Sequence, residues 1–302
     1  MKRIYKIIGI VIVLLIIGLG FAGNYFYNYA VVPSEKDFLS PKAEAAEKKD
    51  PWFDGKTREN WYQVSSDDLK LRAIYLPAEK DQNKTAILAH GYMGEAEEMK
   101  DYAKMYHDMG YNVLIPDARG HGKSEGDYIG FGWPERKDYV GWINEVLKKN
   151  GNNEEITLFG VSMGAATVMM TSGEKLPKNV VSIVEDCGYS SAKAELTYQY
   201  NELFDLPDFP LMEVTSLITK LRAGYFFEDA DVLKQLKKNK VPMLFIHGDK
   251  DTFVPTSMLA QVYQATDAPK EKWVVHGAEH AKSFSVDPSA YKEKVQSFLE
   301  KY

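Results

Sequence analysis

The sequence predicts an α/β protein in which helices cover both faces of a mostly parallel, eight-stranded sheet. Short β-rich runs alternate with helical patterns from Trp61 onward, and most runs end in a turn-forming or polar residue. Of the 302 residues, 45% are hydrophobic, which suffices for one large core. We expect strands at residues 61–65, 71–76, 85–89, 112–116, 156–160, 180–185, 243–247 and 272–275, the first two forming a hairpin.

Helical patterns occupy most of the intervals between the expected strands. In an open α/β sheet, ligands bind at the carboxyl ends of the strands, so the chemistry is expected there. The expected helices cover residues 97–109, 134–149, 165–174, 257–265 and 289–301.

The N-terminus carries a candidate membrane anchor. Three basic residues precede the uncharged run Ile7–Gly23, whose 17 residues span roughly 26 Å as a helix, close to a bilayer core of about 30 Å. Because basic residues stay on the cytoplasmic side, the following domain is expected outside the cell membrane. Four aromatic residues after the run are expected at the membrane interface: Tyr25, Phe26, Tyr27 and Tyr29.

A cleaved signal peptide is the alternative for this segment, since residues 20–22 form an acceptable cleavage site and cleavage would give a secreted protein. We place the anchor or signal at residues 1–29 and a linker at residues 30–52, where Pro, Ser, Glu, Lys and Ala replace apolar residues. Within the linker, a short helix is expected at residues 42–49. The catalytic domain is then expected to cover residues 53–302.

Charge and cysteine content exclude several classes of function. The net charge of -6 gives no overall attraction to phosphate backbones, so we expect no nucleic-acid partner. Cys187 is the only cysteine, which excludes an intramolecular disulfide and a cysteine-based metal cluster. The histidines and carboxylates show no metal-ligand spacing, and no nucleotide site is evident, so neither a metal nor a cofactor is expected.

A candidate nucleophile follows the strand expected at residues 156–160. Gly160-Val161-Ser162-Met163-Gly164 has the G-x-S-x-G pattern, with a strand before it and a small-residue helix start after it. The tight turn needs two flanking positions without bulky side chains, and it holds the serine exposed at a helix N-terminus. Ser162 is therefore the expected nucleophile.

A serine hydroxyl needs an imidazole to accept its proton and an acid to orient that imidazole. In enzymes with such an elbow, the acid and then the histidine follow the serine along the chain. We prefer His280, in the loop before the last helix, to His276, which directly ends a strand.

The acid is expected on the loop after the strand at residues 243–247. Asp251 is preferred to Asp249, which we assign to stabilising the turn. Asp186, at the end of an earlier strand, is a weaker candidate because a turn role accounts for it.

The oxyanion that forms during acyl transfer needs two hydrogen-bond donors. One is expected to be the backbone N–H of Met163, which follows the nucleophile, and the other the backbone N–H of Tyr92. Gly91 lets the backbone approach the substrate there. The side chains of Tyr92 and Met93 are expected to line the substrate pocket.

From residue 61 to the C-terminus, the chain resembles the α/β-hydrolase superfamily. It is similar to Bem46-type and serine-aminopeptidase-like bacterial hydrolases, and to membrane-anchored fluorophosphonate-binding serine esterases. The motifs that carry the resemblance, in chain order, are His90-Gly91-Tyr92, the Asp117–Ser124 loop, the elbow at Ser162, His247-Gly248-x-x-Asp251 and the His280 loop.

This resemblance implies the α/β-hydrolase fold, with a helical cap inserted after strand 6 at about residues 190–236. That segment is rich in aromatic and aliphatic residues, an apolar lid that suits acyl or aromatic substrates. The resemblance also implies that Arg119 and His121 are structural. Which cap residues face the pocket stays open.

The leading functional hypothesis is a carboxylesterase or small-lipid lipase that acts through Ser162, His280 and Asp251 on a small acyl ester or lipid. The second is a peptidase or amidase with the same triad, which needs a carboxylate for a free amino group. A non-catalytic binding module is the third, disfavoured because all three triad residues are present. The oligomeric state is left open. The nominal carboxylates for the second hypothesis are Glu95, Glu97, Glu195 and Glu202.

Overall fold

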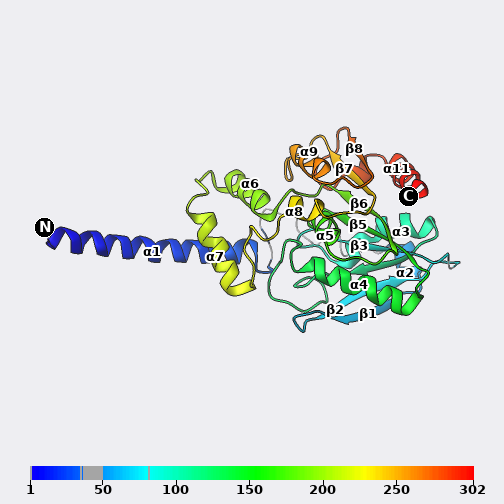
Figure 1. Cartoon of the computed structure of the whole chain (residues 1–302), viewed down its shortest axis with the longest axis horizontal. Helices are drawn as coiled ribbons and strands as arrows, with labels where there is room; N and C mark the ends of the chain where they lie inside the picture. The colour runs from blue at the N-terminus through cyan, green and yellow to red at the C-terminus, as the bar shows by residue number, and fades with distance from the viewer. Residues whose placement is uncertain (1, 35, 37–49, 81) are drawn as a thin grey trace.

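The computed structural model describes residues 2–34, 36, 50–80 and 82–302. Its centre is an eight-stranded sheet of order β1-β2-β4-β3-β5-β6-β7-β8 (Figure 1). The pairs β1–β2 and β2–β4 are antiparallel, and the other pairs are parallel. The strands are β1 (Glu59–Val64), β2 (Lys70–Leu76), β3 (Lys84–Ala89), β4 (Asn112–Pro116), β5 (Glu155–Val161), β6 (Val180–Asp186), β7 (Met243–Gly248) and β8 (Lys270–Val275).

This sheet confirms the predicted fold class. All eight predicted strands are present, each with ends within two residues of the prediction. The helices of the sheet domain are α2 (Pro51–Gly55), the 3-10 helix η2 (Ala96–Met99), α3 (Lys100–Asp108), α4 (Glu135–Asn150), α5 (Met163–Thr171), α8 (Val232–Leu236), α9 (Ser257–Gln264), α10 (Ser283–Val286) and α11 (Pro288–Lys301).

Two apolar cores cover the two faces of the sheet. Successive side chains of a strand point to opposite faces. Ile87 and Leu158 accordingly join the core under α4, α5, α8 and α9, while Leu88 and Phe159 join the core under α3 and α11. Burial of the central strands on both faces explains why their sequences are apolar without alternation.

The cap lies between β6 and β7, as the fold prediction had it. It consists mainly of α6 (Ala192–Phe204) and α7 (Leu211–Ala223). Ser191 caps α6 by accepting a hydrogen bond from the N–H of Ala194, and Gly224 ends α7 in the left-handed conformation.

The N-terminal helix α1 (Lys2–Ala30) projects from the body of the molecule (Figure 1). Its most apolar 18-residue window has a mean hydropathy of 2.7, and none of that window is buried. At about 1.5 Å per residue, the helix is long enough to cross a bilayer. A signal sequence has the same properties.

The last two turns of α1 pack against the cap. Gly23 lies so close to α7 that an added Cβ would be 2.7 Å from Val214 Cγ1 and 3.0 Å from Ile218 Cδ1. Tyr27 is buried, and the Phe26 ring contacts cap aromatic rings. Contacts with this distant segment bury Tyr27 and half-bury Phe26, which the aromatic pattern alone did not indicate.

The expected linker is partly built into the domain. Val31 is fully buried, and its carbonyl accepts a hydrogen bond from the N–H of Ile129 at 2.8 Å. At the other end, Asp50 caps α2 through the N–H groups of Trp52 and Phe53. The short helix expected at residues 42–49 lies outside the described residues.

Candidate active site

The turn between β5 and α5 holds Ser162 in a conformation that few residues adopt. Its backbone has φ 57° and ψ -117°, in the left-handed half of conformational space. An added Cβ on Gly160 would lie 2.2 Å from the Gly164 carbonyl oxygen, and one on Gly164 would lie 2.1 Å from the Ala89 carbonyl oxygen. Both flanking positions therefore require glycine, which is the steric demand of a nucleophile elbow.

His280 joins Ser162 to Asp251 through two hydrogen bonds. The Ser162 hydroxyl lies 2.9 Å from His280 Nε2 and can donate to it. His280 Nδ1 lies 2.8 Å from Asp251 Oδ2, which accepts the Nδ1 proton. This arrangement fixes the tautomer that leaves Nε2 free to accept a proton.

The environment of Asp251 keeps its carboxylate charged. Burial opposes its ionisation, but hydrogen bonds from His247 and His280 outweigh burial and lower the pKa of Asp251 to about 2. Its other oxygen accepts the N–H groups of Phe253 and Val254, each at 2.9 Å. Asp251 is thus an ionised, firmly positioned hydrogen-bond acceptor at neutral pH.

A second histidine supports Asp251 from within the core. The Nε2–H of His247 lies 2.9 Å from the Val254 carbonyl oxygen and 3.3 Å from Asp251 Oδ2. Burial lowers the pKa of His247, but these two acceptors and the nearby Glu185 carboxyl outweigh burial and raise it. From the sequence, His247 was expected only to end the strand at residues 243–247. It contacts Asp251 because a short loop is all that separates the two residues.

The alternative residues weighed from the sequence lie in other networks. Asp249 accepts hydrogen bonds from the N–H of Gly277 at 2.7 Å and from His276, whose side chain is 92% exposed. Asp186 accepts hydrogen bonds from the hydroxyls of Ser283 and Tyr291, and burial raises its pKa to about 6. Neither carboxyl contacts His280.

The expected oxyanion loop lies beside Ser162. An added Cβ on Gly91 would be 3.6 Å from Ser162 Cβ, and Met163 is the first residue of α5, so its N–H has no acceptor within the helix. His121 Nε2 accepts the N–H of Met93 at 3.2 Å and braces this loop. Tyr92 and Met163 line the pocket, whereas Met93, which the sequence had placed there, is not among its described lining residues.

A pocket of about 820 Å³, including its open mouth, leads from Ser162 to the cap. Its wall is mostly aromatic and aliphatic. The lining residues are Phe26, Tyr29, Ala30, Tyr92, Phe131, Ser162, Met163, Tyr189, Glu195, Leu196, Gln199, Tyr200, Leu203, Phe204, Leu211, Met212, Thr215, Phe227, Phe253 and Val254.

Glu195, on α6, is the only Asp, Glu, Lys or Arg among the described residues that line this pocket. Its Oε1 accepts a hydrogen bond from Gln199 Nε2 at 3.0 Å, and its Oε2 has no partner among the residues described. Burial raises the pKa of Glu195 to about 8, so the carboxyl is protonated at neutral pH. It offers a hydrogen-bond donor inside an apolar pocket.

A metal ion is a second chemical possibility at this site. Cys187, Asp251 and His280 place potential ligand atoms within 4.8 Å of one another. Burial raises the pKa of the Cys187 thiol well above its usual value, so forming a thiolate there is unfavourable. Asp251 and His280 are already bonded to each other, so this donor set fits a triad better than a metal site.

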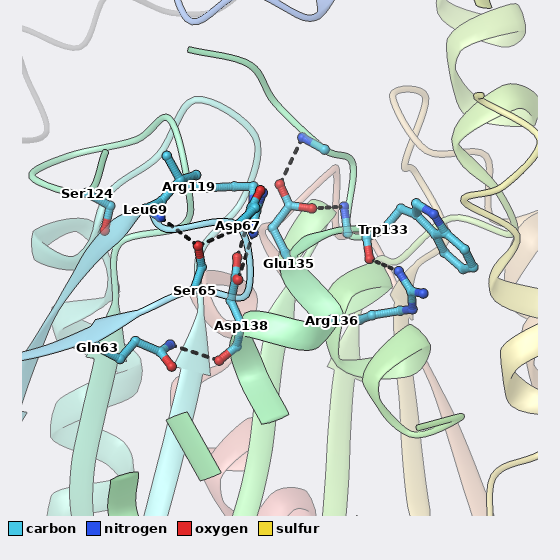
Figure 2. A network of polar contacts seen from close by, with 12 residues as sticks. Gln63, Ser65, Asp67, Leu69, Arg119, Ser124, Trp133, Glu135, Arg136 and Asp138 are labelled. Atoms are coloured by element: carbon cyan, nitrogen blue, oxygen red, sulfur yellow. Dashed lines mark hydrogen bonds and ion pairs between the residues drawn. The ribbon is translucent and has the colours of Figure 1, made fainter. Parts of the chain in front are cut away.

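The loop after β4 is held by an ion-pair network around the buried Arg119 (Figure 2). The Arg119 guanidinium donates to both oxygens of Asp138, each at 2.8 Å, and to both oxygens of Asp67, at 2.7 and 3.0 Å. Glu135 accepts the N–H groups of Gly130 and Gly132 and so fixes the next loop. Arg119 is thus enclosed by structural partners, the role that the resemblance implied.

Comparisons with known proteins support the same architecture. The serine aminopeptidase S33 family model matches residues 80–187. The esterase Pf2001 of Pyrococcus furiosus superposes with a TM-score of 0.68 at 23% identity, covering 84% of this chain and 96% of that one. The chain has the α/β-hydrolase fold. Among curated proteins, this chain is 26% identical to the uncharacterized protein YqkD of Bacillus subtilis over 300 residues, which cover 99% of this chain and 98% of YqkD.

A further relative of this chain is the thermostable monoacylglycerol lipase of Bacillus sp. strain H-257. The two are 22% identical over 248 residues, which cover 72% of this chain and 90% of the lipase.

Several pocket residues were not found from the sequence. Phe131 follows β4 in a loop and stacks on Tyr92 at 5.7 Å between ring centroids. Phe26 and Tyr29 lie on α1, more than 130 residues before Ser162. The aromatic cluster after the apolar run was the only signal for them, and it was interpreted as a membrane interface.

Proposed function

We propose that this α/β-hydrolase cleaves carboxylic esters by a serine mechanism, with Ser162 as nucleophile, His280 as general base and acid, and Asp251 as the orienting acid. The observation that carries the proposal is the continuous hydrogen-bonded chain from Ser162 Oγ through both ring nitrogens of His280 to Asp251.

The proposed reaction proceeds through an acyl-enzyme. Ser162 Oγ attacks the ester carbonyl carbon while its proton passes to His280 Nε2. The backbone N–H groups of Tyr92 and Met163 stabilise the resulting oxyanion, each by about 3 kcal/mol. His280 then protonates the departing alcohol, and water activated by the same nitrogen releases the acid.

The pocket supports an ester substrate with an apolar acyl group. Apart from Ser162, its wall offers few polar groups, and Glu195 is neutral at pH 7. A neutral carboxyl can donate to an ester or alcohol oxygen but gives a free ammonium group no charge. The names of two relatives, a monoacylglycerol lipase and an esterase, agree with this choice.

A peptidase or amidase is the second candidate, and Glu195 is also the observation that favours it. It is the one pocket carboxyl that can contact an amino group, whereas Glu95, Glu97 and Glu202 do not line the pocket. The serine aminopeptidase description of the matching family model agrees with this alternative.

We further propose that α1 crosses the cell membrane once and holds the catalytic domain on its outer side. Lys2, Arg3 and Lys6 precede the exposed apolar part of the helix, which places them on the cytoplasmic side. Cleavage at residues 20–22, the alternative, would release a domain that keeps the docked end of the helix.

The test is active-site labelling of the full chain in detergent micelles. A fluorophosphonate probe should label the wild type, and Ser162→Ala should abolish both labelling and turnover of a short acyl ester. Ser297→Ala, an exposed serine on α11, is the matched control and should retain both. Labelling that persists in Ser162→Ala, or no labelling of folded wild type, would refute the proposed nucleophile.

A further inference from the structure

The end of the N-terminal helix forms part of the pocket wall. Phe26, Tyr29 and Ala30 of α1 line the same pocket as Ser162. The Phe26 ring packs edge-on against Tyr200 and Phe204 of α6, with ring centroids 5.0 and 4.9 Å apart. A segment with the properties of a membrane anchor therefore also encloses the space where the substrate is expected.

Hydrogen bonds fix this end of α1 to the catalytic domain. The Tyr92 hydroxyl donates to the Ala30 carbonyl oxygen at 2.8 Å, which ties the expected oxyanion loop to the last residue of α1. Arg222 of α7 donates to the side-chain oxygens of Asn24 and Asn28, at 2.9 and 3.0 Å. Together with the close contact at Gly23, these bonds hold the helix in one register against the cap.

The cap presents large apolar side chains to solvent around this junction. Leu203 lines the pocket and is itself 41% exposed, so the apolar lining reaches the surface. α6 and α7 lie beside α1 where it leaves the domain (Figure 1). The other exposed apolar residues of the cap are Leu206, Phe209, Leu217 and Leu221.

The distance from the pocket to the apolar part of α1 is short. Phe21 is 75% exposed and belongs to the apolar run, whereas Phe26 belongs to the pocket wall. Five residues of helix separate them by about 7.5 Å along the axis. If the apolar run lies in a bilayer, the cap surface lies at the membrane interface. Contact with lipid there removes the exposed leucines from water, which is favourable.

We propose that the substrate's acyl chain enters the pocket directly from the membrane, beside α1 at the exposed end of α6 where Leu203 carries the apolar lining to the surface, and that the last turns of α1 form the distal wall that contacts long acyl chains. This inference rests on the proposed serine esterase and on the proposed anchor. The occupant of the apolar cap surface is the lipid bilayer itself, because α1 continues from that surface into the membrane. The substrate class is accordingly a membrane-resident acyl ester.

The first experiment compares Phe26→Ala with Phe21→Ala in the full chain reconstituted in phosphatidylcholine vesicles. Both substitutions remove the same side chain from the same helix, but only Phe26 lines the pocket. The measurement is the ratio of kcat/KM for a dodecanoyl ester to kcat/KM for a butanoyl ester. We expect Phe26→Ala to lower this ratio about tenfold and Phe21→Ala to leave it within twofold of wild type.

A second variant covers the case in which Phe26→Ala does not fold. Phe26→Trp keeps an aromatic ring on the cap but narrows the distal end, and it should shift the preferred acyl length downward. Equal changes for both esters, or none, in the folded variants would overturn the assignment of α1 as an acyl wall. Failure of the proposed esterase is distinguishable, because wild type would then turn over neither ester.

The second experiment tests entry from the membrane. Leu217→Gln with Leu221→Gln removes apolar surface from the cap, and Val64→Gln, at an equally exposed position on β1, is the control. For one dodecanoyl ester, we expect the cap variant to lose at least fivefold activity when the ester resides in vesicles and less than twofold when it is dispersed in detergent micelles. Equal losses in the two media, or no loss in vesicles, would overturn membrane entry.

Discussion

The buried carboxyl of Glu195 makes a specific prediction about how stability depends on pH. Glu195→Gln removes the titratable group but keeps a side chain of nearly the same shape that can still bond to Gln199. In the wild type, burial raises the pKa of Glu195 from 4.5 to about 8. The folded protein therefore retains a proton that the unfolded chain releases above pH 4.5.

The sign and size follow from this proton. Because the pKa is raised on folding, the contribution to stability is fully present below pH 4.5 and is lost as pH rises toward about 8. Each pH unit within that window costs at most about 1.4 kcal/mol of unfolding free energy. Between pH 5 and pH 7, the wild type should lose about 2 kcal/mol relative to Glu195→Gln.

Urea unfolding of the full chain in detergent micelles, followed by tryptophan fluorescence at pH 5, 6 and 7, measures this difference. Between pH 5 and pH 7, the unfolding free energy of Glu195→Gln should rise by about 2 kcal/mol relative to that of the wild type. Glu202→Gln, an exposed position on the same helix, is the control and should show a constant gap. A constant gap for Glu195→Gln as well would refute the neutral carboxyl.

Three other substitutions probe the scaffold of the site. His247→Gln weakens the hydrogen bonding to Asp251, so the pKa of Asp251 should rise. A pH–rate profile should show kcat/KM lowered about tenfold, with the largest loss at low pH. Gly164→Ala should prevent recovery of folded protein or lower its unfolding free energy by about 3 kcal/mol or more, whereas Gly55→Ala, with open space around it, should not. Asp138→Asn breaks the buried ion pair of Figure 2 and should cost about 3–5 kcal/mol in chemical unfolding; a loss below 1 kcal/mol would contradict that role.

The sheet and the elbow were predictable from the sequence because their signals are local. The apolar runs of β5 and β7 are buried on both faces, so each stands out from its polar flanks. The elbow adds two steric requirements, at Gly160 and Gly164, to a strand–turn–helix pattern. The assignments of Asp251 and His280 used their order in the chain and their place in loops after strands, and the structure joins both to Ser162.

The pocket wall was not predictable because its contacts join distant parts of the chain. Phe26 contacts residues 200 and 204, and the aromatic pattern that places it in a helix is the same for a lipid interface and a protein interface. In the cap, Leu211 and Met212 line the pocket while Leu217 and Leu221 are exposed. The helical periodicity of a cap segment separates its two faces, but it does not identify the face that packs against the sheet domain.

Glu195 also separates the two proposed functions through linked protons. An amine-bearing substrate is a cation near pH 7 and requires an ionised Glu195, so its binding must release the proton that burial retains. Its affinity for the inactive Ser162→Ala protein should then rise by up to about tenfold from pH 6 to pH 7. A neutral ester accepts a hydrogen bond from the protonated carboxyl, and its affinity should not change over that interval. Titration calorimetry with an ester and an amine-bearing amide of matched acyl group therefore assigns the substrate class from the pH dependence of binding alone, and equal pH dependence for both ligands would mean that Glu195 contacts neither.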